Sequence, residues 1–320
     1  MEFWNDKQVL VTGGAGFIAS HLVEELIKKN ARVRVSDNLS RGILQNLESS
    51  LRNVEFVDTD LMIPKNCEES CKDVDMVFNL AAKVAGVGYN ITHPAEMFYK
   101  NSVITSNMLE AARKKNVDGF MVISSACVYS RFSTIPTHED DGFIKDPEPT
   151  NFGYGWAKRL AEIQAKTYHQ EYGMNIGIIR PYNAYGPRDY FNLEEGHVIP
   201  VLIKKVIEKW NPLVVWGDGE QSRSFIYVED IVNGLILGAE KYLVPDPINI
   251  GNDEEIKIKD LISLIISISG NNINVQFDKN KPSGQPRRCP DIQKAKKILD
   301  FEPKISLKEG LTKTLKWHIT

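Results

Sequence analysis

The stretch Val9-Leu-Val-Thr-Gly-Gly-Ala-Gly-Phe-Ile-Ala-Ser20 decides the fold, because a strand pattern, a glycine turn and a helix start follow one another directly. The glycines let the backbone approach a diphosphate closely. The amino terminus of the helix adds free N–H groups and the positive end of the helix dipole. The spacing is Gly13-x-x-Gly16-x-x-Ala19, with alanine where a third glycine is common. This pattern predicts the phosphate-binding turn of a dinucleotide-binding unit.

An acidic residue closes the next predicted strand. Asp37 lies 24 residues after Gly13, at the end of the run Arg32–Ser36. A carboxylate in this place hydrogen-bonds the ribose 2′-OH and repels a 2′-phosphate, which predicts NAD rather than NADP. Two alternatives stay open, because Asp37 could simply cap a turn and Arg41 could accept a 2′-phosphate. The pattern as a whole favours NAD.

Short β-branched runs alternate with helical patterns through the first half of the chain. The expected strands are Gln8–Val11, Arg32–Val35, Val54–Val57, Met76–Leu80, Phe120–Ile123 and Ile176–Ile179. Strands separated by helices predict parallel βαβ units, and therefore an α/β fold with a doubly wound parallel Rossmann sheet. After Arg180 the elements become short and mixed, which predicts a smaller mixed α/β C-terminal lobe.

The change of pattern suggests where the chain divides. We expect residues 1–180 to form the NAD-binding Rossmann domain, with a return segment at about 224–251. Within that segment Ser224–Val228 and Ile248–Ile250 are expected strands that could rejoin the first sheet. Residues 181–223 and 252–320 then form the substrate-binding lobe.

Composition excludes several classes of protein. The 320 residues include 42% hydrophobic and 25% charged residues, values that exclude disorder, collagen and coiled coil. A net charge of −3 without a basic run argues against nucleic acid as a partner. No signal peptide or membrane-spanning run is visible, so we expect a cytoplasmic protein. Four cysteines do not make a disulfide framework, and Cys67 and Cys71 lack further ligands, so no metal is expected.

Three residues predict proton transfer at an alcohol or ketone. Ser125 follows the expected strand Phe120–Ile123, and Tyr154 and Lys158 lie four residues apart, on one face of a helix. A nearby ammonium lowers the pKa of a phenol, which would make Tyr154 a usable base near neutrality. The Ser125 hydroxyl could hydrogen-bond the same substrate oxygen.

Five motifs together carry a resemblance to a known family. They are Thr12-Gly-Gly-Ala-Gly-Phe-Ile, Asn79-Leu-Ala-Ala, Ser124-Ser-Ala-Cys-Val-Tyr, Tyr154-Gly-Trp-Ala-Lys and Arg180-Pro-Tyr-Asn-Ala-Tyr-Gly-Pro. Almost from end to end, the chain resembles the extended short-chain dehydrogenase/reductase superfamily, and within it the NAD-dependent epimerase/dehydratase family. The resemblance implies NAD in the first lobe, a nucleotide sugar in the second, and a homodimer through helices matching Asn101–Lys115 and Tyr154–Tyr172.

The resemblance also implies which positions hold the cofactor. They are Gly13, Gly16, Phe17, Ile18, Asp37, Asn38, Arg41, Asp60, Leu61, Leu80, Ala81, Ala82, Lys83, Asn101, Tyr154, Lys158 and Tyr182.

Two further residues narrow the resemblance. Cys127 lies two places after Ser125, hence on the same face of an extended segment, and His197 begins His-Val-Ile-Pro. The segments Ser-Ala-Cys and His-Val-Ile-Pro, with Lys83-Val-Ala-Gly-Val-Gly-Tyr-Asn, are similar to segments of GDP-L-fucose synthase and GDP-mannose 3,5-epimerase. In those families the residues that match Cys127 and His197 are the proton-transfer pair. The second of these relatives has lysine in place of His197. The structural alternatives are a buried core cysteine and a loop histidine bonded to the backbone.

A substrate site is expected in the second lobe. The resemblance implies that it contains Gly86, Ser125, Asn183, His197, Val198, Trp216, Arg223, Arg287 and Arg288. Arginine forks suit diphosphate oxygens, so Arg223 and either Arg287 or Arg288 resemble the family's sugar-nucleotide clamp. Solvated surface charge is the alternative. The Pro282-Ser-Gly-Gln-Pro-Arg pattern favours a GDP sugar.

The resulting hypothesis is an NAD-dependent epimerase of a GDP-hexose. Oxidation at C4 would make the C3 and C5 protons acidic, and Cys127 and His197 would exchange them from opposite faces. The alternatives are a fucose synthase-like 4-keto-sugar epimerase/reductase, a C4 epimerase, and a non-catalytic NAD-binding regulator. A 4,6-dehydratase is disfavoured, because Ala126-Cys127 stands where that group has an Asp-Glu pair. Ser130 stands where the two relatives usually have proline, so sugar specificity could differ from both.

Overall fold

The computed structural model describes residues 3–193, 195–281 and 285–319. Seven parallel strands form the central sheet in the order β11-β6-β5-β4-β1-β2-β3. They are β1 Gln8–Thr12, β2 Arg32–Asp37, β3 Val54–Asp58, β4 Met76–Asn79, β5 Gly119–Ile123, β6 Ile176–Pro181 and β11 Ile248–Ile250. The expected doubly wound parallel sheet is therefore confirmed.

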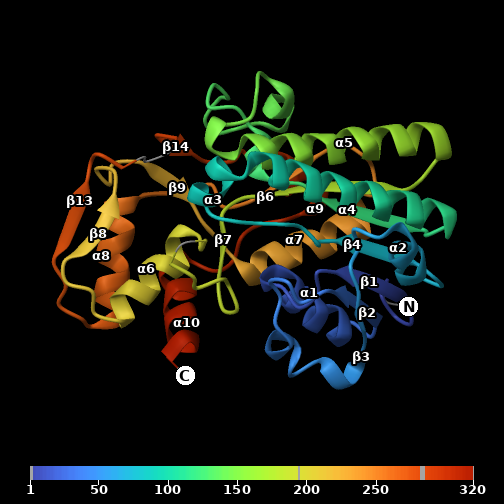
Figure 1. Ribbon diagram of the computed structural model, residues 1–320, viewed down its shortest axis with the longest axis horizontal. Coiled ribbons are helices and arrows are strands. Elements are labelled where there is room, and N and C mark those ends of the chain that lie inside the picture. Colours follow the sequence, from blue (N-terminus) through green and yellow to red (C-terminus); the bar gives the residue numbers. More distant parts are fainter. Residues whose placement is uncertain (1–2, 194, 282–284, 320) are drawn as a thin grey trace.

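Helices cover both faces of this sheet (Figure 1). One face packs against α1 Phe17–Lys28, α7 Val228–Lys241 and α9 Gln293–Leu299, and the other against α2 Pro64–Ser70, α4 Pro94–Lys114 and α5 Phe152–Tyr172. Strand side chains alternate between the two apolar layers, so that Val9 and Val11 contact the first set while Leu10 contacts the second. The sheet is buried on both sides, which is the usual environment of parallel strands.

The second lobe is smaller and mixed, as expected. Its helices are α6 Val198–Ile207, α8 Ile258–Ser269 and α10 Leu307–Ile319. Its short strands are β7 Ala184–Tyr185, β8 Leu213–Trp216, β9 Ser222–Ser224, β10 Ile226–Tyr227, β12 Glu255–Lys257, β13 Val275–Asp278 and β14 Arg287–Arg288. The remaining elements are α3 Val87–Thr92 and the 3₁₀ turns Leu44–Leu47, Leu51–Asn53, Ala126–Val128, Glu139–Phe143 and Pro149–Asn151. A separate apolar core fills this lobe.

One of the two strands expected to rejoin the first sheet does so. Ile248–Ile250 is β11 and pairs with β6, whereas the expectation for Ser224–Val228 is wrong. Ser224 ends β9 in a separate three-stranded sheet, and α7 begins at Val228. The strand-like run Ser224–Val228 was misleading because its residues pair in two different small sheets.

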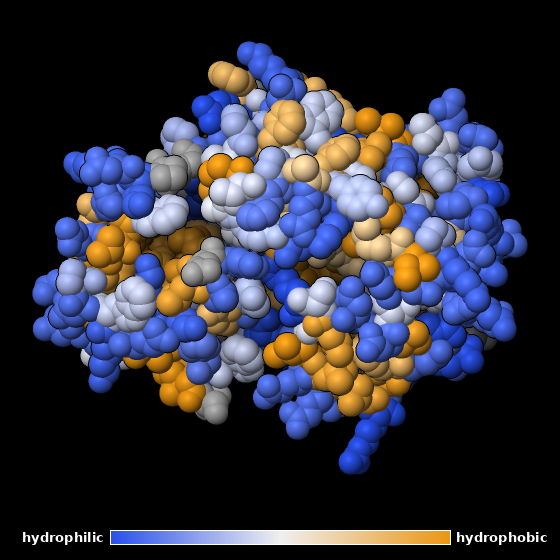
Figure 2. Space-filling model, in the orientation of Figure 1, coloured by the Kyte–Doolittle hydropathy of each residue, from blue (hydrophilic) through white to orange (hydrophobic). Residues whose placement is uncertain are grey.

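The carboxyl ends of the central strands share one edge, where the sequence-predicted residues gather. The strand order reverses direction between β1 and β4, and ligands bind at such a switch point. Here the Thr12 hydroxyl donates to Asn79 Oδ1 at 2.9 Å and accepts from Ala81 N at 3.0 Å. Figure 2 shows the surface hollowed where the two lobes meet, with apolar side chains beside the hollow. No helix in the described ranges is long and apolar enough to cross a membrane.

Helix α1 also holds the loop that follows β7. His21 Nε2 lies 3.0 Å from Pro187 O, and Glu24 forms a 2.6 Å ion pair with Arg188. Burial lowers the pKa of His21 to about 4, so the imidazole is neutral in the folded protein at pH 7. The loop from residue 187 is thereby fixed to the first lobe.

His21 makes folding stability depend on pH. As pH falls from 6.5 towards 4, the unfolded chain binds a proton at His21 that the folded protein does not, so stability is lost. We expect the free energy of unfolding to fall by about 2 kcal/mol between pH 7 and pH 5 through this residue. Urea titrations at both pH values measure it, with His21→Gln and the exposed His169→Gln as matched variants. An equal loss in His21→Gln would contradict the assignment.

Candidate active site

The phosphate turn has the backbone that the glycines were expected to provide. Gly13 has φ +65°, and a Cβ added there would lie 2.9 Å from Ala81 Cα, so the turn packs directly against the end of β4. Gly13 N donates to Ser36 O at 2.8 Å, and Gly16 is the N-cap of α1. Ala19, at the third glycine position, is buried in the core, and the helix packs on the sheet with this methyl group in place.

Asp37 lies at the end of β2 with its carboxylate beside the turn. Its Oδ2 accepts from Ala15 N at 3.0 Å and its Oδ1 from Leu39 N at 2.8 Å. Burial raises the pKa of Asp37, and these two backbone donors oppose that rise. The residue therefore organises a turn and at the same time places a hydrogen-bond acceptor at the mouth of the phosphate turn.

Arg41 extends across the cleft between the lobes. Its guanidinium lies 4.3 Å from the centre of the Tyr190 ring, on the loop after β7. Burial lowers the pKa of Arg41, with Asp189 the strongest opposing charge. One terminal nitrogen has no hydrogen-bond partner within the described parts of the chain. Arg41 thus packs against the second lobe.

The other predicted cofactor residues follow β3 and β4 or face them from α4. Asp60 and Leu61 come directly after β3, and residues 80–83 come directly after β4. Asn101 on α4 is buried and donates to Lys83 O at 3.0 Å. Its carbonyl oxygen is buried without a partner among the residues that the structure describes. An unpaired acceptor and a glycine cradle on one edge fit a bound dinucleotide.

Ser125, Tyr154 and Lys158 come together at the end of β5. The Lys158 ammonium donates to Ile123 O at 2.7 Å and lies 5.5 Å from the centre of the Tyr154 ring. Burial raises the pKa of Tyr154, while a hydrogen bond with Ser125 opposes the rise. The expectation that Lys158 lowers this pKa is therefore wrong for the protein alone, because burial dominates. Burial also lowers the pKa of Lys158 to about 8.

Cys127 lies beside these residues, but not on an extended segment as expected. Residues Ala126–Val128 form a 3₁₀ turn, because Ser125 Oγ accepts from Cys127 N at 3.1 Å and turns the chain. The thiol is half-buried, and its charge would interact with both Tyr154 and Lys158. An added Cβ at Gly155 would lie 2.4 Å from Cys127 O, so glycine is required for α5 to approach this turn.

His197 is the N-cap of α6 and approaches the site from the second lobe. Its side chain is 47% exposed, and Nδ1 lies 3.9 Å from Asp189 Oδ1. Gly86, after β4, meets the same loop by donating to Glu195 O at 2.9 Å. Arg41 interacts electrostatically with both Asp189 and Tyr154. Val198 follows at the first position of α6.

Two arginines of the second lobe lie on adjacent strands. Arg223 on β9 and Arg288 on β14 are direct partners in a parallel register. Burial and, to a lesser extent, the nearby Arg288 lower the pKa of Arg223 to about 10. Two neighbouring cations with restricted hydration suit a diphosphate. Asn183, at the end of β6, donates to Ser224 O on the same β9 strand, while Trp216 is half-exposed at the end of β8.

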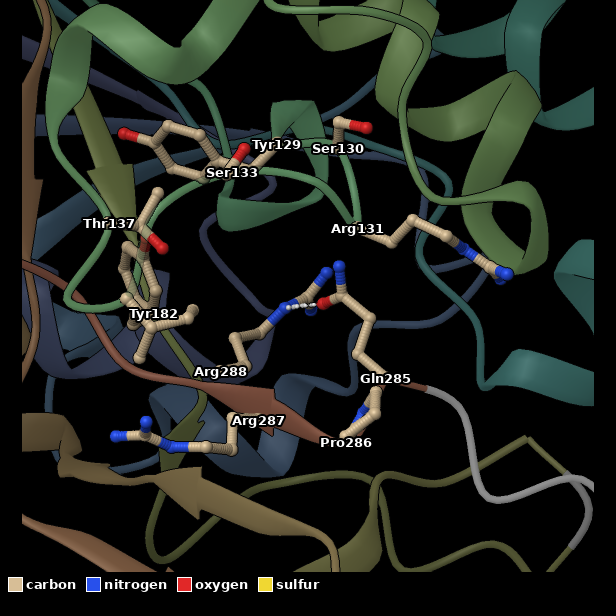
Figure 3. Close-up of a pocket in the computed structure, with 11 residues that line it drawn as sticks. Tyr129, Ser130, Arg131, Ser133, Thr137, Tyr182, Gln285, Pro286, Arg287 and Arg288 are labelled. Atoms are coloured by element: carbon tan, nitrogen blue, oxygen red, sulfur yellow. Dashed lines mark hydrogen bonds between the residues drawn. The ribbon is translucent and has the colours of Figure 1, made fainter.

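Arg288 and Arg287 point in different directions. A pocket of about 190 Å³ lies between the loop after β5 and β14, and Figure 3 shows the Arg288 guanidinium directed into it. Arg288 Nε donates to Gln285 Oε1 at 3.1 Å. Arg287 points away, pairs with Glu255 and is 58% exposed. Tyr182, expected at the cofactor, lines this same pocket. Residues 282–284 of the Pro-x-Gly-x-Pro-Arg pattern lie outside the described residues.

Because the Arg287 and Arg288 side chains point in different directions, we expect their replacement to affect substrate binding unequally. If Arg288 holds the diphosphate as expected from the sequence, replacing it by glutamine should raise the KM for a nucleotide sugar about 10- to 100-fold, because a charge-assisted phosphate contact would be lost. Arg287→Gln is the matched control and should change KM less than about threefold. Initial-rate kinetics with each variant measures both values. A larger effect at Arg287 would reverse the assignment.

Comparison with known proteins identifies the family. The model of the NAD dependent epimerase/dehydratase family matches residues 9–251. The chain belongs to this family. Within it, the chain is 31% identical to a dTDP-4-dehydro-6-deoxy-D-allose reductase of Streptomyces sp (98% of this chain, 97% of the relative). It is 35% identical to UDP-glucuronic acid decarboxylase 1 of Arabidopsis thaliana (95% and 68%) and 31% identical to a GDP-L-fucose synthase of Sinorhizobium fredii (98% and 96%).

Solved structures of the epimerase/dehydratase family agree with the fold and the cofactor. UDP-glucose 4-epimerase of Thermotoga maritima with UDP-glucose superposes with a TM-score of 0.90, at 31% identity over 98% of both chains. UDP-glucuronic acid 4-epimerase of Bacillus cereus, with UDP-glucuronic acid and NAD, superposes with a TM-score of 0.86, at 30% identity over 97% and 98%. The chain is therefore an NAD-dependent enzyme of the nucleotide-sugar type. GDP-L-fucose synthase is one of several relatives, beside UDP- and dTDP-sugar enzymes.

Proposed function

We propose that this enzyme is a nucleotide-sugar epimerase that inverts C3, C5 or both of a hexose, with a GDP-hexose as the favoured substrate. The observation that carries the proposal is the Cys127 thiol, which lies beside Tyr154 and Lys158. Inversion at C4 would need no proton-transfer group besides Tyr154, whereas inversion at C3 or C5 needs one such as this thiol. His197 supports it as a second such group, approaching from the other lobe. The GDP preference rests on the Pro-x-Gly-x-Pro-Arg pattern and on the two GDP-sugar relatives that the sequence resembles.

The residues divide the reaction between them. When bound, NAD would supply the hydride acceptor for C4 and, in its reduced form, the hydride donor. Tyr154 takes the proton of the C4 hydroxyl, and Ser125 hydrogen-bonds the same oxygen. The resulting ketone makes the neighbouring C–H protons acidic. Cys127 and His197 then remove a proton from one face and deliver another to the opposite face, which inverts the carbon without net oxidation.

Isotope exchange tests this proposal. The holoenzyme is incubated in heavy water with GDP-mannose, UDP-glucose, UDP-glucuronic acid and dTDP-glucose in separate reactions, and products are examined by NMR and mass spectrometry. Deuterium at C3 or C5 with an epimeric product, and no added reductant, is the expected result. Cys127→Ser should stop this exchange while NAD is still reduced by the sugar. A C4 epimer without deuterium would contradict the proposal.

A reductase is the second candidate, favoured by two relatives that align over nearly the whole chain. Their names describe a 4-dehydro-6-deoxy-sugar reductase and a GDP-L-fucose synthase. Such an enzyme would consume reduced cofactor stoichiometrically with a 4-keto-6-deoxy sugar nucleotide. Absorbance at the reduced-nicotinamide band measures that consumption. Asp37 at the ribose position favours NAD over NADP in this reaction too.

We further propose that the enzyme is a homodimer through α4 and α5. These helices pack side by side (Figure 1), and their outer surface exposes Phe98, Tyr99 and Ile163. Ile163→Glu should convert the dimer to a monomer, because a carboxylate would be buried in an apolar contact. Light scattering after size-exclusion chromatography measures the mass. Ile319→Glu, at an exposed residue of α10, is the control and should leave the dimer intact.

A further inference from the structure

Asp189 is an acidic residue without an assigned task on the loop between β7 and α6. Its side chain is 3% exposed, and its Oδ1 accepts from Tyr190 N at 2.7 Å. The other oxygen, Oδ2, is buried with no hydrogen-bond partner in the described part of the chain. A buried carboxylate with an unpaired oxygen is costly, so a partner or a function is expected for it.

Three contacts, two to α1 and one to α10, hold the loop that carries Asp189. Pro187 accepts from His21 on α1, and Arg188 pairs with Glu24 on the same helix. Beyond Asp189, the Phe191 ring stacks on His318 of α10 with centroids 4.2 Å apart. The position of the Asp189 carboxylate is therefore fixed by both lobes.

The charged groups around Asp189 point to one partner. Burial raises the pKa of Asp189. Among the neighbouring charges, His197 opposes this rise most strongly, followed by Arg41. Arg41 also interacts with Tyr190, Glu195 and Tyr154. Among the carboxylates that the structure describes, Asp189 alone lies within ion-pair distance of His197. Arg41 acts on Asp189 only through longer-range electrostatics, since the described residues show no ion pair between them, whereas His197 Nδ1 lies 3.9 Å from Asp189 Oδ1.

We propose that Asp189 is the positioning residue of His197: its carboxylate accepts from Nδ1–H, so that Nε2 faces the sugar and carries the proton to be transferred. The inference rests on the proposed function for its chemistry. In the step, the imidazolium gives its Nε2 proton to the carbanion next to the ketone, a C–H bond forms, and the neutral ring is reprotonated by solvent. A carboxylate at Nδ1 selects the tautomer and stabilises the imidazolium.

Histidine NMR tests the contact without any sugar. In NAD-loaded protein labelled with ¹⁵N-histidine, wild-type His197 should be the Nδ1–H tautomer when neutral. Asp189→Asn should raise the fraction of the neutral Nε2–H tautomer of His197, since the carboxylate acceptor for Nδ1–H is lost. Glu195→Gln removes the same charge two residues from His197 and should leave the Nδ1–H tautomer dominant. An Nε2–H tautomer in the wild type, or the same tautomer in all three proteins, would overturn the proposal.

Isotope exchange then separates this inference from the proposed function. Asp189→Asn should slow deuterium exchange about 10- to 100-fold and move the limb of its pH profile to lower pH. The rate of NAD reduction by the sugar should not change, and Asp189→Glu should restore part of the exchange. Unchanged exchange and pH profile in Asp189→Asn would refute the positioning role. If the wild-type enzyme shows no deuterium exchange while the expected His197 tautomer is observed by NMR, only the proposed function is refuted.

Discussion

Tyr154→Phe is expected to lower the rate at which a nucleotide sugar reduces NAD by about 1,000-fold. The change removes the only hydroxyl of this side chain and leaves the ring that packs beside Lys158. Under the proposed function, the proton of the C4 hydroxyl would then have no base, although Ser125 could still hydrogen-bond the substrate. Stopped-flow absorbance at the reduced-nicotinamide band measures the first turnover directly.

Tyr168→Phe is the matched control on the same helix. Tyr168 donates to Glu110 at 3.2 Å, on the α4 side of the pair of helices, and its hydroxyl should contribute nothing to the rate. If both variants lose the same fraction of activity, the effect comes from helix packing. If neither loses activity, Tyr154 is not the base.

Arg180→Met is expected to lower the free energy of unfolding by about 3–5 kcal/mol. Arg180 at the end of β6 and Glu162 on α5 form a bidentate pair at 2.8 and 2.7 Å, with side chains 1% and 0% exposed. Removing the guanidinium leaves a buried carboxylate unpaired and also removes a donor to the Tyr129 hydroxyl. Guanidinium titration measures the loss, and the melting temperature should fall by roughly 10 °C.

Two comparison proteins test the cause of that loss. Lys28→Met removes the cation of the exposed pair with Glu25 and should shift the melting temperature by no more than about 2 °C. Arg180→Met combined with Glu162→Leu removes both charges and should recover much of the lost stability, because neither member of the pair is left as an unpaired buried charge. A double variant as unstable as the single one would show that packing, not charge, carries the cost.

The local part of the architecture could be predicted because short-range chemistry determines it. Gly13, Gly16 and the strand before them form one continuous segment, and the residue spacing within such a segment fixes its geometry. Tyr154 and Lys158 lie one helical turn apart for the same reason. The parallel strands of the central sheet were predicted to within one or two residues, since all of them except the edge strand β3 consist mainly of buried residues.

The second lobe could not be predicted in the same way. β9 and β14 have three and two residues, and they bring together Arg223 and Arg288 from distant parts of the chain. Strands this short carry no periodic signal. The pairing also explains why Arg287 and Arg288 could not be told apart by sequence, since adjacent strand residues point to opposite faces.

Two features of the site depend on tertiary structure and could not be predicted from the sequence. The 3₁₀ turn at Cys127 depends on a side-chain acceptor, Ser125 Oγ, that competes with extended backbone. Asp189 stands in a polar loop, where an acid looks like ordinary solvated charge; only its burial and its distance from His197 mark it. Nearness in sequence could not have identified it, because Glu195 is closer to His197 along the chain than Asp189 is.

The return of β11 to the edge of β6 has a consequence for how the molecule melts. A fragment that stops at residue 180 would leave Ile179 and Arg180 on an unpaired rim and would lack α7, which packs in the same apolar layer as Ile179. Because the polypeptide passes out of the dinucleotide-binding half and comes back to complete it, neither half is a continuous piece. Calorimetry should accordingly record a single heat-absorption peak, with both halves losing structure in the same transition.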